Sequence, residues 1–240
     1  MTVVDAPSSL LAWSGGLGRL FRPVGYASDF DICEQFDPWL LQWRLAKTCP
    51  ADLAAVSGLS EALRLVFTTV HARRAPVGVI GPRDATDDEY GMAESLGRLL
   101  AVHGLQMICG GMGGVMEAAC KGHLQAGGAP VGLLPQDEWN SGNPYVAIPI
   151  ATGIGAARNA IIARASIVLV AVGGGYGTLT EMAYGLHFNR LVLGLGKTPF
   201  VAGAVPCASP AEAISRVAGH VLERMNDPPA TDQTGITKDR

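Results

Sequence analysis

Two glycine-rich segments of the sequence begin where an apolar stretch gives way to a helical pattern. Residues 109–117 read CGGMGGVME, and residues 173–181 read GGGYGTLTE. Glycine lets backbone N–H groups approach an anion closely, and a helix N-terminus adds about half a positive charge. Both segments therefore predict phosphate binding, although glycines at such places can also serve only to make tight turns. The residues expected to bind phosphate or a nucleotide are Gly110, Gly111, Gly113, Gly174, Gly175, Tyr176, Gly177 and Thr178.

An arginine lies between the two glycine segments, in the stretch TGIGAARN at residues 152–159. The guanidinium of Arg158 could hold a phosphate or a carboxylate through two hydrogen bonds. An arginine at the start of a helix can equally belong to a solvated helix face. Neither glycine segment has the G-x-G-x-x-G spacing of a dinucleotide site, so a dinucleotide cofactor is not expected. Weaker candidates for the site are Glu117, Asn159 and Arg83.

Composition and charge exclude several classes of function. The chain has 240 residues, of which 48% are hydrophobic and 16% are charged, and its formal net charge is −3. Lysines and arginines form no run, so we expect no nucleic-acid partner and no binding to a membrane. The apolar segments are far shorter than the roughly 20 residues that span a bilayer, and the first residues lack a signal-peptide pattern. We therefore expect a soluble cytoplasmic protein.

The cysteines and histidines show no pattern typical of a metal site or a disulfide framework. The five cysteines are odd in number and include no C-x-x-C pair, and the five histidines are scattered along the chain. No metal site is therefore expected. The cysteines expected to be free thiols are Cys33, Cys49, Cys109, Cys120 and Cys207.

The elements that would position the candidate residues follow an alternating pattern. From residue 76 onward, short Val/Ile/Leu-rich runs alternate with helical patterns, as in parallel strands joined by crossover helices. The predicted fold class is therefore α/β, with a Rossmann-like doubly wound parallel sheet. The expected strands cover residues 76–81, 105–109, 130–135, 145–150, 166–172 and 191–195. The expected helices begin near Thr86 and then cover about residues 113–126, 156–165, 177–188 and 209–224.

The two ends of the chain differ from this alternating core. The first 75 residues show no strand alternation and contain two helical patterns, one opened by Asp37 and one by Ser60. The last dozen residues are polar and lack a helical or strand pattern, which is typical of disorder. The expected organisation is a helical N-terminal extension over 1–75, a Rossmann-like nucleotide-binding domain over 76–226 and a disordered tail over 227–240.

The order and spacing of these motifs resemble the LOG family, also called the lysine-decarboxylase-like family, within the Rossmann-like group. The resemblance covers roughly residues 76–195. In that family a P-G-G-x-G-T-x-x-E segment supplies phosphate-binding amides and a catalytic glutamate, and an arginine fifteen positions before its proline assists. The resemblance implies that Glu181 is the catalytic glutamate and that Arg158, fifteen positions before Gly173, is the assisting arginine. Because the family's enzymes are usually homodimers, it also implies a homo-oligomer, a dimer or larger.

The sequence departs from the hydrolase pattern of that family at three positions. Gly173 replaces the proline, Thr180 replaces the first of two paired glutamates, and Asn159 replaces a lysine that commonly follows the arginine. With these residues the chain looks at least as much like the branch that includes the molybdenum cofactor carrier proteins. Those proteins bind a phosphorylated pterin and do not hydrolyse a nucleotide. Similarity of fold does not decide between the two functions.

Two functions of different class follow from the resemblance. The leading hypothesis is a phosphoribohydrolase that cleaves the N-glycosidic bond of a nucleoside 5'-monophosphate and requires no cofactor. Glu181 would then stabilise positive charge at the anomeric carbon or orient the attacking water, and Arg158 would orient the substrate or assist the departing base. The alternative is a non-catalytic carrier with the molybdenum cofactor or a nucleotide as its bound ligand. A further alternative is a scaffold without chemistry whose N-terminal extension binds a protein partner.

Overall fold

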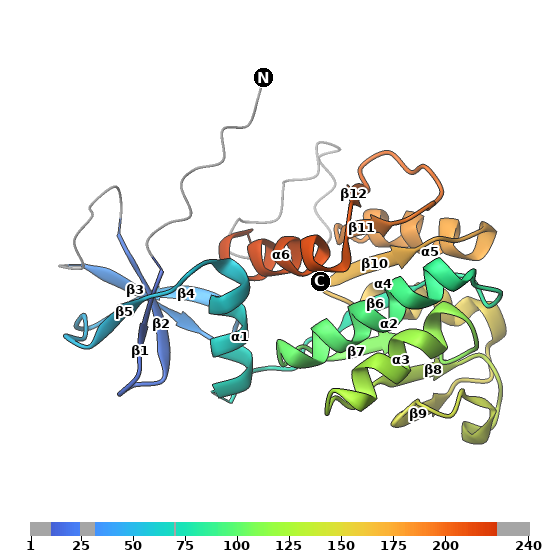
Figure 1. The fold of residues 1–240 in the computed structure, drawn as a ribbon, viewed down its shortest axis with the longest axis horizontal. Coiled ribbons are helices and arrows are strands. Elements are labelled where there is room, and N and C mark those ends of the chain that lie inside the picture. Colours follow the sequence, from blue (N-terminus) through green and yellow to red (C-terminus); the bar gives the residue numbers. More distant parts are fainter. Residues whose placement is uncertain (1–10, 25–31, 70, 225–240) are drawn as a thin grey trace, which may run out of the picture.

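A small antiparallel sheet and a larger parallel sheet lie at opposite ends of the molecule (Figure 1). The computed structural model describes residues 11–24, 32–69 and 71–224. The larger sheet has the strand order β12-β11-β10-β6-β7-β8-β9, and every neighbouring pair is parallel. Its strands are β6 (Val77–Ile80), β7 (Met107–Cys109), β8 (Val131–Leu134), β9 (Ile148–Ala151), β10 (Val168–Val172), β11 (Leu191–Leu195) and β12 (Val205–Cys207).

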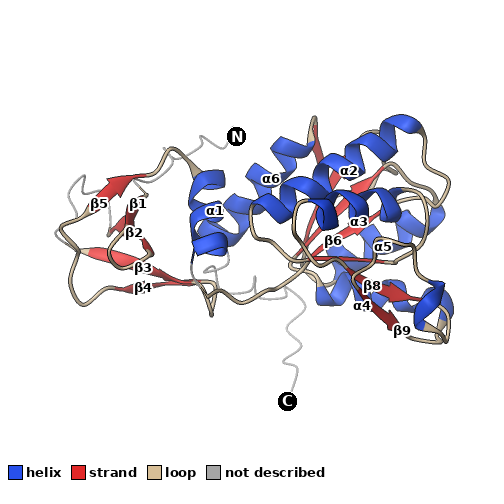
Figure 2. Ribbon diagram, turned by 60° about the horizontal axis from the view of Figure 1, so that its bottom comes forward, coloured by secondary structure: helices blue, strands red, loops and turns tan. Residues whose placement is uncertain are grey.

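Helices cover both faces of the parallel sheet, which confirms the predicted Rossmann-like α/β fold. Buried side chains of α2 (Asp87–Val102), α3 (Val115–Gln125) and α6 (Pro210–Gly219) form the core on one face. Those of α4 (Arg158–Ala165) and α5 (Tyr176–His187) form the core on the other. Figure 2 shows α2, α3 and α6 on one side of the strands and α4 on the opposite side. Short helical turns η1 (Trp139–Ser141), η2 (Gly155–Ala157) and η3 (His220–Arg224) complete this part.

Local sequence signals account for most of these elements. α2 begins as predicted, because the Thr86 hydroxyl accepts the Glu89 N–H while the Glu89 carboxylate accepts the Thr86 N–H. The five residues of β10 are all buried, as expected of a central strand with helices on both faces. β12 was not predicted, because a three-residue edge strand with a proline at its centre gives almost no apolar pattern.

The strand order places a crevice between β6 and β10. β6 is followed in the chain by α2 and pairs with β7 on one side, whereas on its other side it pairs with β10. The direction of winding therefore reverses between β6 and β10, and open α/β sheets bind ligands at the carboxyl ends of strands at such a point. The second glycine-rich segment follows β10 directly and so lies at this edge.

The helical interpretation of the N-terminal extension is largely wrong, because this region forms a five-stranded antiparallel sheet in the order β4-β3-β2-β1-β5. The pattern at Asp37 is not a helix: the Asp37 carboxylate accepts the N–H groups of Trp39 and Leu40 and closes a turn between two strands. Phe36 and Trp43 face each other across that pair with ring centroids 5.3 Å apart. The pattern at Ser60 does form a helix. The elements are β1 (Ala12–Ser14), β2 (Arg19–Pro23), β3 (Cys33–Asp37), β4 (Gln42–Leu45), β5 (Leu53–Ala55) and α1 (Leu59–Thr69).

A disulfide bond corrects the expectation that all five cysteines are free. Cys33 and Cys49 are bonded, with their Cα atoms 5.9 Å apart. Since β4 and β5 lie at opposite edges of the small sheet, the connection between them must cross it, and the disulfide ties this connection to β3. Cys109, Cys120 and Cys207 are free and buried. The sequence could not show the pairing, because it depends on which strands lie side by side.

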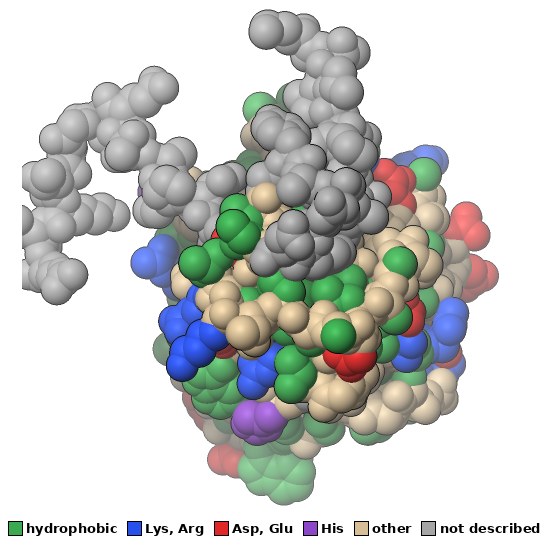
Figure 3. All heavy atoms as spheres, turned by 90° about the vertical axis from the view of Figure 1, so that its left-hand side faces the viewer, with side chains coloured by type: hydrophobic (Ala, Val, Ile, Leu, Met, Phe, Trp, Pro, Cys, Tyr) green, Lys and Arg blue, Asp and Glu red, His purple; other side chains and the backbone are tan. Residues whose placement is uncertain are grey.

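The small sheet and the parallel-sheet domain share a continuous hydrophobic core. The Trp43 indole N–H donates to the carbonyl oxygen of Leu222, 2.5 Å away, and thereby joins β4 to η3. Leu20 and Phe36 from the sheet belong to the same buried cluster as Leu63 of α1 and residues of α6. The outer end of the sheet, which Figure 3 views head-on, mixes hydrophobic side chains with lysines and arginines. The expected disordered tail over 227–240 lies outside the described residues.

Thiol titration tests the disulfide. In denaturant and without reductant we expect three reactive thiols per chain, and two in the Cys207→Ser variant, which serves as the control. Reduction should lower the free energy of unfolding by about 3 kcal/mol, because the bond closes a loop of 16 residues. Five reactive thiols in the unreduced protein would contradict the assignment.

Candidate functional site

A pocket of about 360 Å³ lies at the crevice between β6 and β10. Segments that follow β6, β8 and β10 contribute to it, together with α3, η2 and α4. All these strand ends meet at the carboxyl edge of the sheet, where the strand order predicts a ligand site. The lining residues are Gly81, Pro82, Arg83, Met116, Pro135, Ala156, Arg158, Asn159, Gly175, Gly177, Thr178 and Glu181.

Arg158 and Glu181 form a buried ion pair in this pocket. The arginine is 5% exposed and the glutamate 6%, and Arg158 Nη1 lies 3.7 Å from Glu181 Oε1. Burial raises the pKa of Glu181 to about 7, although the nearby Arg158 charge acts in the opposite direction. Burial likewise lowers the pKa of Arg158, and the Glu181 charge partly offsets this. The carboxyl group therefore exchanges its proton near neutral pH, which is unusual for a glutamate and frequent at functional sites.

Two further hydrogen bonds fix the guanidinium of Arg158. Nη1 donates to Asn159 Oδ1 over 2.7 Å, and Nη2 donates to the carbonyl oxygen of Gly110 over 3.2 Å. Arg158 Nε is buried and has no hydrogen-bond partner among the described residues. A buried N–H without a partner is costly, so it indicates where an additional acceptor could bind.

The second glycine segment places the N-terminus of α5 at the same pocket. Gly175 precedes the first residue of the helix, and no side chain caps this end. The first N–H groups of a helix have no partner within it, and three of the residues at this start, Gly175, Gly177 and Thr178, line the pocket. An anion bound here would therefore accept backbone N–H groups and favour the positive end of the helix dipole.

The structure explains why a glycine stands where the LOG pattern has a proline. Gly173 has a φ of +58°, a value that the ring of proline cannot adopt. A Cβ atom at this position would also overlap the carboxylate of Glu89, the residue that completes the capping box of α2. Gly174, with a φ of +133°, lies against the side chain of Thr178 in the same tight connection.

The glycines of the first segment lie behind the pocket. Gly110, Gly111 and Gly113 do not line it. Gly110 holds Arg158 through its carbonyl oxygen, and a Cβ atom at Gly110 would overlap the guanidinium. Gly114 has a φ of +66° and lies against the carbonyl oxygens of the loop after β6. These glycines thus support the pocket from outside, and direct phosphate binding by them stays a prediction.

The other candidates divide between the pocket and the surface. Arg83 and Asn159 line the pocket, whereas Glu117 lies outside it on α3, near Tyr90. Tyr176 is 90% exposed and points away from the protein. The sequence analysis did not select Pro82, Met116, Pro135 or Ala156 as pocket residues. Their position directly after strands or at helix starts was the one available signal, because their side chains carry no reactive group.

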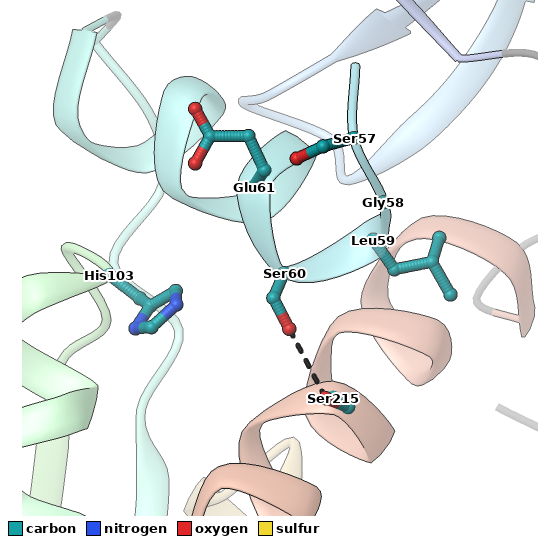
Figure 4. Close-up of a pocket in the computed structure, with 7 residues that line it drawn as sticks. All are labelled: Ser57, Gly58, Leu59, Ser60, Glu61, His103 and Ser215. Atoms are coloured by element: carbon teal, nitrogen blue, oxygen red, sulfur yellow. Dashed lines mark hydrogen bonds between the residues drawn. The ribbon is translucent and has the colours of Figure 1, made fainter.

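A second hollow, drawn in Figure 4, lies where α1, the end of α2 and α6 meet. Ser60 of α1 and Ser215 of α6 hydrogen-bond to each other there over 3.3 Å, and the carboxylate of Glu61 accepts two hydrogen bonds from Arg64. The side chains of Ser60, Glu61 and Ser215 thus already have partners within the protein. Within the described ranges, no group of three histidine, cysteine or acidic residues could hold a metal ion, and no helix is long and apolar enough to cross a bilayer.

Comparison with known proteins agrees with this fold. A family model described as the SLOG cluster4 family matches residues 74–218. The chain belongs to the SLOG cluster4 family. The expected LOG-like, Rossmann-like branch is thereby confirmed at the level of this family. The matched residues include the pocket and both glycine segments. The small N-terminal sheet lies outside the matched residues.

Individual relatives match the same part of the chain. An uncharacterized protein of Archaeoglobus fulgidus is 40% identical over 139 residues, which cover 58% of this chain and 91% of that protein. The molybdenum cofactor binding protein of Rippkaea orientalis is 32% identical, with a TM-score of 0.59, over 63% of this chain and 99% of its own. The molybdenum cofactor carrier protein of Chlamydomonas reinhardtii is 38% identical, with a TM-score of 0.54, over 60% of this chain and 96% of its own.

The contact between Gly110 and Arg158 can be tested by adding one methyl group. Gly110→Ala should displace the guanidinium from its buried position and lower the free energy of unfolding by about 2 kcal/mol. Gly113→Ala is the matched control in the same segment: the nearest atom to its added Cβ is 3.7 Å away, and we expect a change within about 0.5 kcal/mol. Equal effects of the two substitutions in chemical denaturation would contradict the proposed support of Arg158.

The raised pKa of Glu181 predicts a pH dependence of stability. The folded protein binds the proton of the Glu181 carboxyl group more tightly than the unfolded chain does. The free energy of unfolding should therefore fall as the pH rises from 4.5, the ordinary pKa of a glutamate, to about 7, the pKa of Glu181 in the folded protein. The loss should be about 3 kcal/mol, and it should be absent in Glu181→Gln. Denaturation of both proteins at several pH values provides the measurement, and parallel pH profiles would contradict the raised pKa.

Proposed function

We propose that the protein binds a phosphorylated small molecule in the pocket between β6 and β10, as a carrier of a molybdenum-cofactor-type pterin. The observation that carries the proposal is the balance of charge in the pocket. Arg83 and Arg158 both line it, beside the N-terminus of α5, whereas its single carboxylate is Glu181. With a pKa of about 7, Glu181 is half neutral at physiological pH, so the pocket attracts an anion.

The residues present fit the phosphate end of such a ligand. Gly175 and Gly177 have open space where a Cβ would lie, so the amides at the start of α5 can be approached closely. The Nε atom of Arg158 offers an unused donor in the same pocket. The ligand's pterin and metal would supply the redox chemistry in whatever enzyme receives it, while this chain's residues bind and shield it.

The relatives favour a carrier over a nucleotide hydrolase. Two proteins that match almost over their whole length are described as a binding protein and a carrier protein for the molybdenum cofactor. The side chain of Thr180, which stands in place of a glutamate, donates to the carbonyl oxygen of Gly177 and does not line the pocket. The pocket therefore lacks the second carboxylate that two-acid glycoside hydrolysis uses.

Hydrolysis of a nucleoside 5'-monophosphate is the second candidate, and Glu181 is the observation in its favour. A buried carboxyl group with a pKa of about 7 can both hold and release a proton at neutral pH. It lies one helical turn beyond Thr178, so it would be near the sugar of a ligand whose phosphate rests on the α5 amides.

Binding is tested with an engineered charge at the start of α5. Gly177→Asp places a carboxylate where the phosphate would lie, without a steric clash, and it should weaken binding of molybdenum cofactor released from a molybdoenzyme by about 100-fold. Gly15→Asp, in the turn between β1 and β2 of the small sheet, is the control, because a Cβ there also meets open space and Gly15 does not line the pocket, so this variant should bind like the wild type. Equal binding by all three proteins, followed by fluorescence of the oxidised pterin, would contradict the site.

A second assay, on the wild type and Glu181→Gln, separates the two functions. Incubation with a panel of nucleoside 5'-monophosphates, followed by chromatography of free base, should show binding at most and no base release if the protein is a carrier. Base release that is lost in Glu181→Gln would instead establish the hydrolase. Failure to bind any phosphorylated ligand would overturn both.

A further inference from the structure

Two free thiols touch each other directly behind the pocket. Cys109 ends β7 and Cys120 lies in α3, and their Sγ atoms are 3.4 Å apart. Both residues are completely buried. The remaining free cysteine, Cys207, lies on the edge strand β12. The S–S distance of a disulfide is about 2.05 Å, so the sulfurs of Cys109 and Cys120 need to approach by roughly 1.4 Å to form one.

The surroundings of the two sulfurs make Cys109 the more acidic thiol. Its hydrogen bond with Cys120 lowers the pKa of Cys109, and although burial acts in the opposite direction, the Gly111 N–H and the Arg158 charge lower this pKa further. The Gly111 N–H donates to Cys109 Sγ over 3.3 Å. The hydrogen bond between the thiols and burial both raise the pKa of Cys120. Cys109 is therefore suited to attack an oxidant as a thiolate, and Cys120 to close the disulfide afterwards.

Packing determines which of the two cysteines moves when the bond forms. α3 is fixed against α2, because a Cβ atom at Gly97 of α2 or at Gly122 of α3 would overlap a backbone carbonyl oxygen of the other helix. Cys120 lies two residues before Gly122 and so belongs to this fixed segment. Cys109, in contrast, is the last residue of a strand of three residues and is followed by glycines. Formation of the bond therefore draws Cys109 and the adjoining Gly110 toward α3.

Gly110 transmits this movement to the pocket. Its carbonyl oxygen accepts a hydrogen bond from Arg158 Nη2 over 3.2 Å, which is already near the upper limit for such a bond. α3 and α4 cover opposite faces of the sheet, so a movement toward α3 takes Gly110 away from Arg158 at the start of α4. The guanidinium then loses one of the partners that hold it in place, and it no longer keeps its position in the pocket.

We propose that a peroxide oxidises Cys109 and Cys120 to a disulfide, which loosens Arg158 and lowers the affinity of the pocket for its ligand; the effect on affinity rests on the proposed function. The Cys109 thiolate attacks hydrogen peroxide, so an S–O bond forms, the O–O bond breaks, and hydroxide takes up the proton that the thiol had lost and leaves as water. The Cys120 sulfur then attacks the Cys109 sulfur, the S–S bond forms, the S–O bond breaks, and the second oxygen leaves as water. Two thiols thus lose two electrons, and the peroxide gains them. Because both sulfurs are buried, a small oxidant reaches them through local opening, whereas a bulky disulfide does not.

Thiol titration and peptide mapping test the oxidation itself. In denaturant the untreated protein should show three reactive thiols, and protein treated with hydrogen peroxide should show one, with its mass lower by two hydrogen atoms. Mapping should find Cys109 joined to Cys120. Cys207→Ser is the control that keeps the pair, so its count should fall from two to none, whereas Cys120→Ser should form no such link. Three thiols that persist in the treated wild type, or added oxygen without a Cys109–Cys120 link, would overturn the proposal.

The effect on the pocket is measured on reduced and oxidised wild type, so it requires no substitution. In heteronuclear NMR spectra the Arg158 Nε–H signal, assigned by through-bond correlation to its backbone, should shift on oxidation. After removal of the peroxide, the oxidised protein should bind molybdenum cofactor released from a molybdoenzyme about tenfold more weakly, the effect of about one lost hydrogen bond. An unchanged Arg158 signal, or equal affinity of the two forms, would overturn the coupling. If the reduced protein does not bind the cofactor, the proposed function fails, while the Arg158 signal still tests the link between the thiols and the pocket.

Discussion

The candidate site depends on keeping the guanidinium of Arg158 buried. A cation removed from water is costly unless every donor finds a partner, and here the partners come from three different places in the chain. Gly110 offers a carbonyl oxygen, Asn159 an amide oxygen and Glu181 a carboxylate. The turn after β7, the start of α4 and the first turns of α5 must therefore hold their relative positions, and the parallel sheet that orders their strands is what fixes them.

The glycines of this site serve two distinct purposes. Those after β10 leave the start of α5 open to a ligand, since Gly175 and Gly177 have free space around them. Those after β7 give room to protein atoms instead: Gly110 to a guanidinium, and Gly114 to the loop after β6. Two segments of similar composition thus have different tasks, one at the pocket and one behind it, and only the packed structure separates them.

The sequence predicted the parallel-sheet domain well because its central strands β6, β7 and β10 are fully buried and α2 has a clear start signal in Thr86 and Glu89. It also selected Arg158 and Glu181, which the fold brings together although 23 positions separate them. It failed in the small sheet, where short strands alternate around turns and a helical spacing of Trp39, Leu40 and Trp43 arises by chance. Two of these residues belong to a turn and the third to a strand. The Cys33–Cys49 bond was missed for the same reason, since it follows from strand neighbours.

The two helices after β9 and β10 link the inner and outer surfaces of the domain. The first turn of α4 carries Arg158 and the second turn of α5 carries Glu181 into the pocket, while their outer faces carry Ile161 and Tyr184. A shift of one helix against the other would break this ion pair, because its atoms are already 3.7 Å apart. A ligand that binds both Arg158 and the amides at the start of α5 would hold the two helices together, so its binding would make the pocket more rigid.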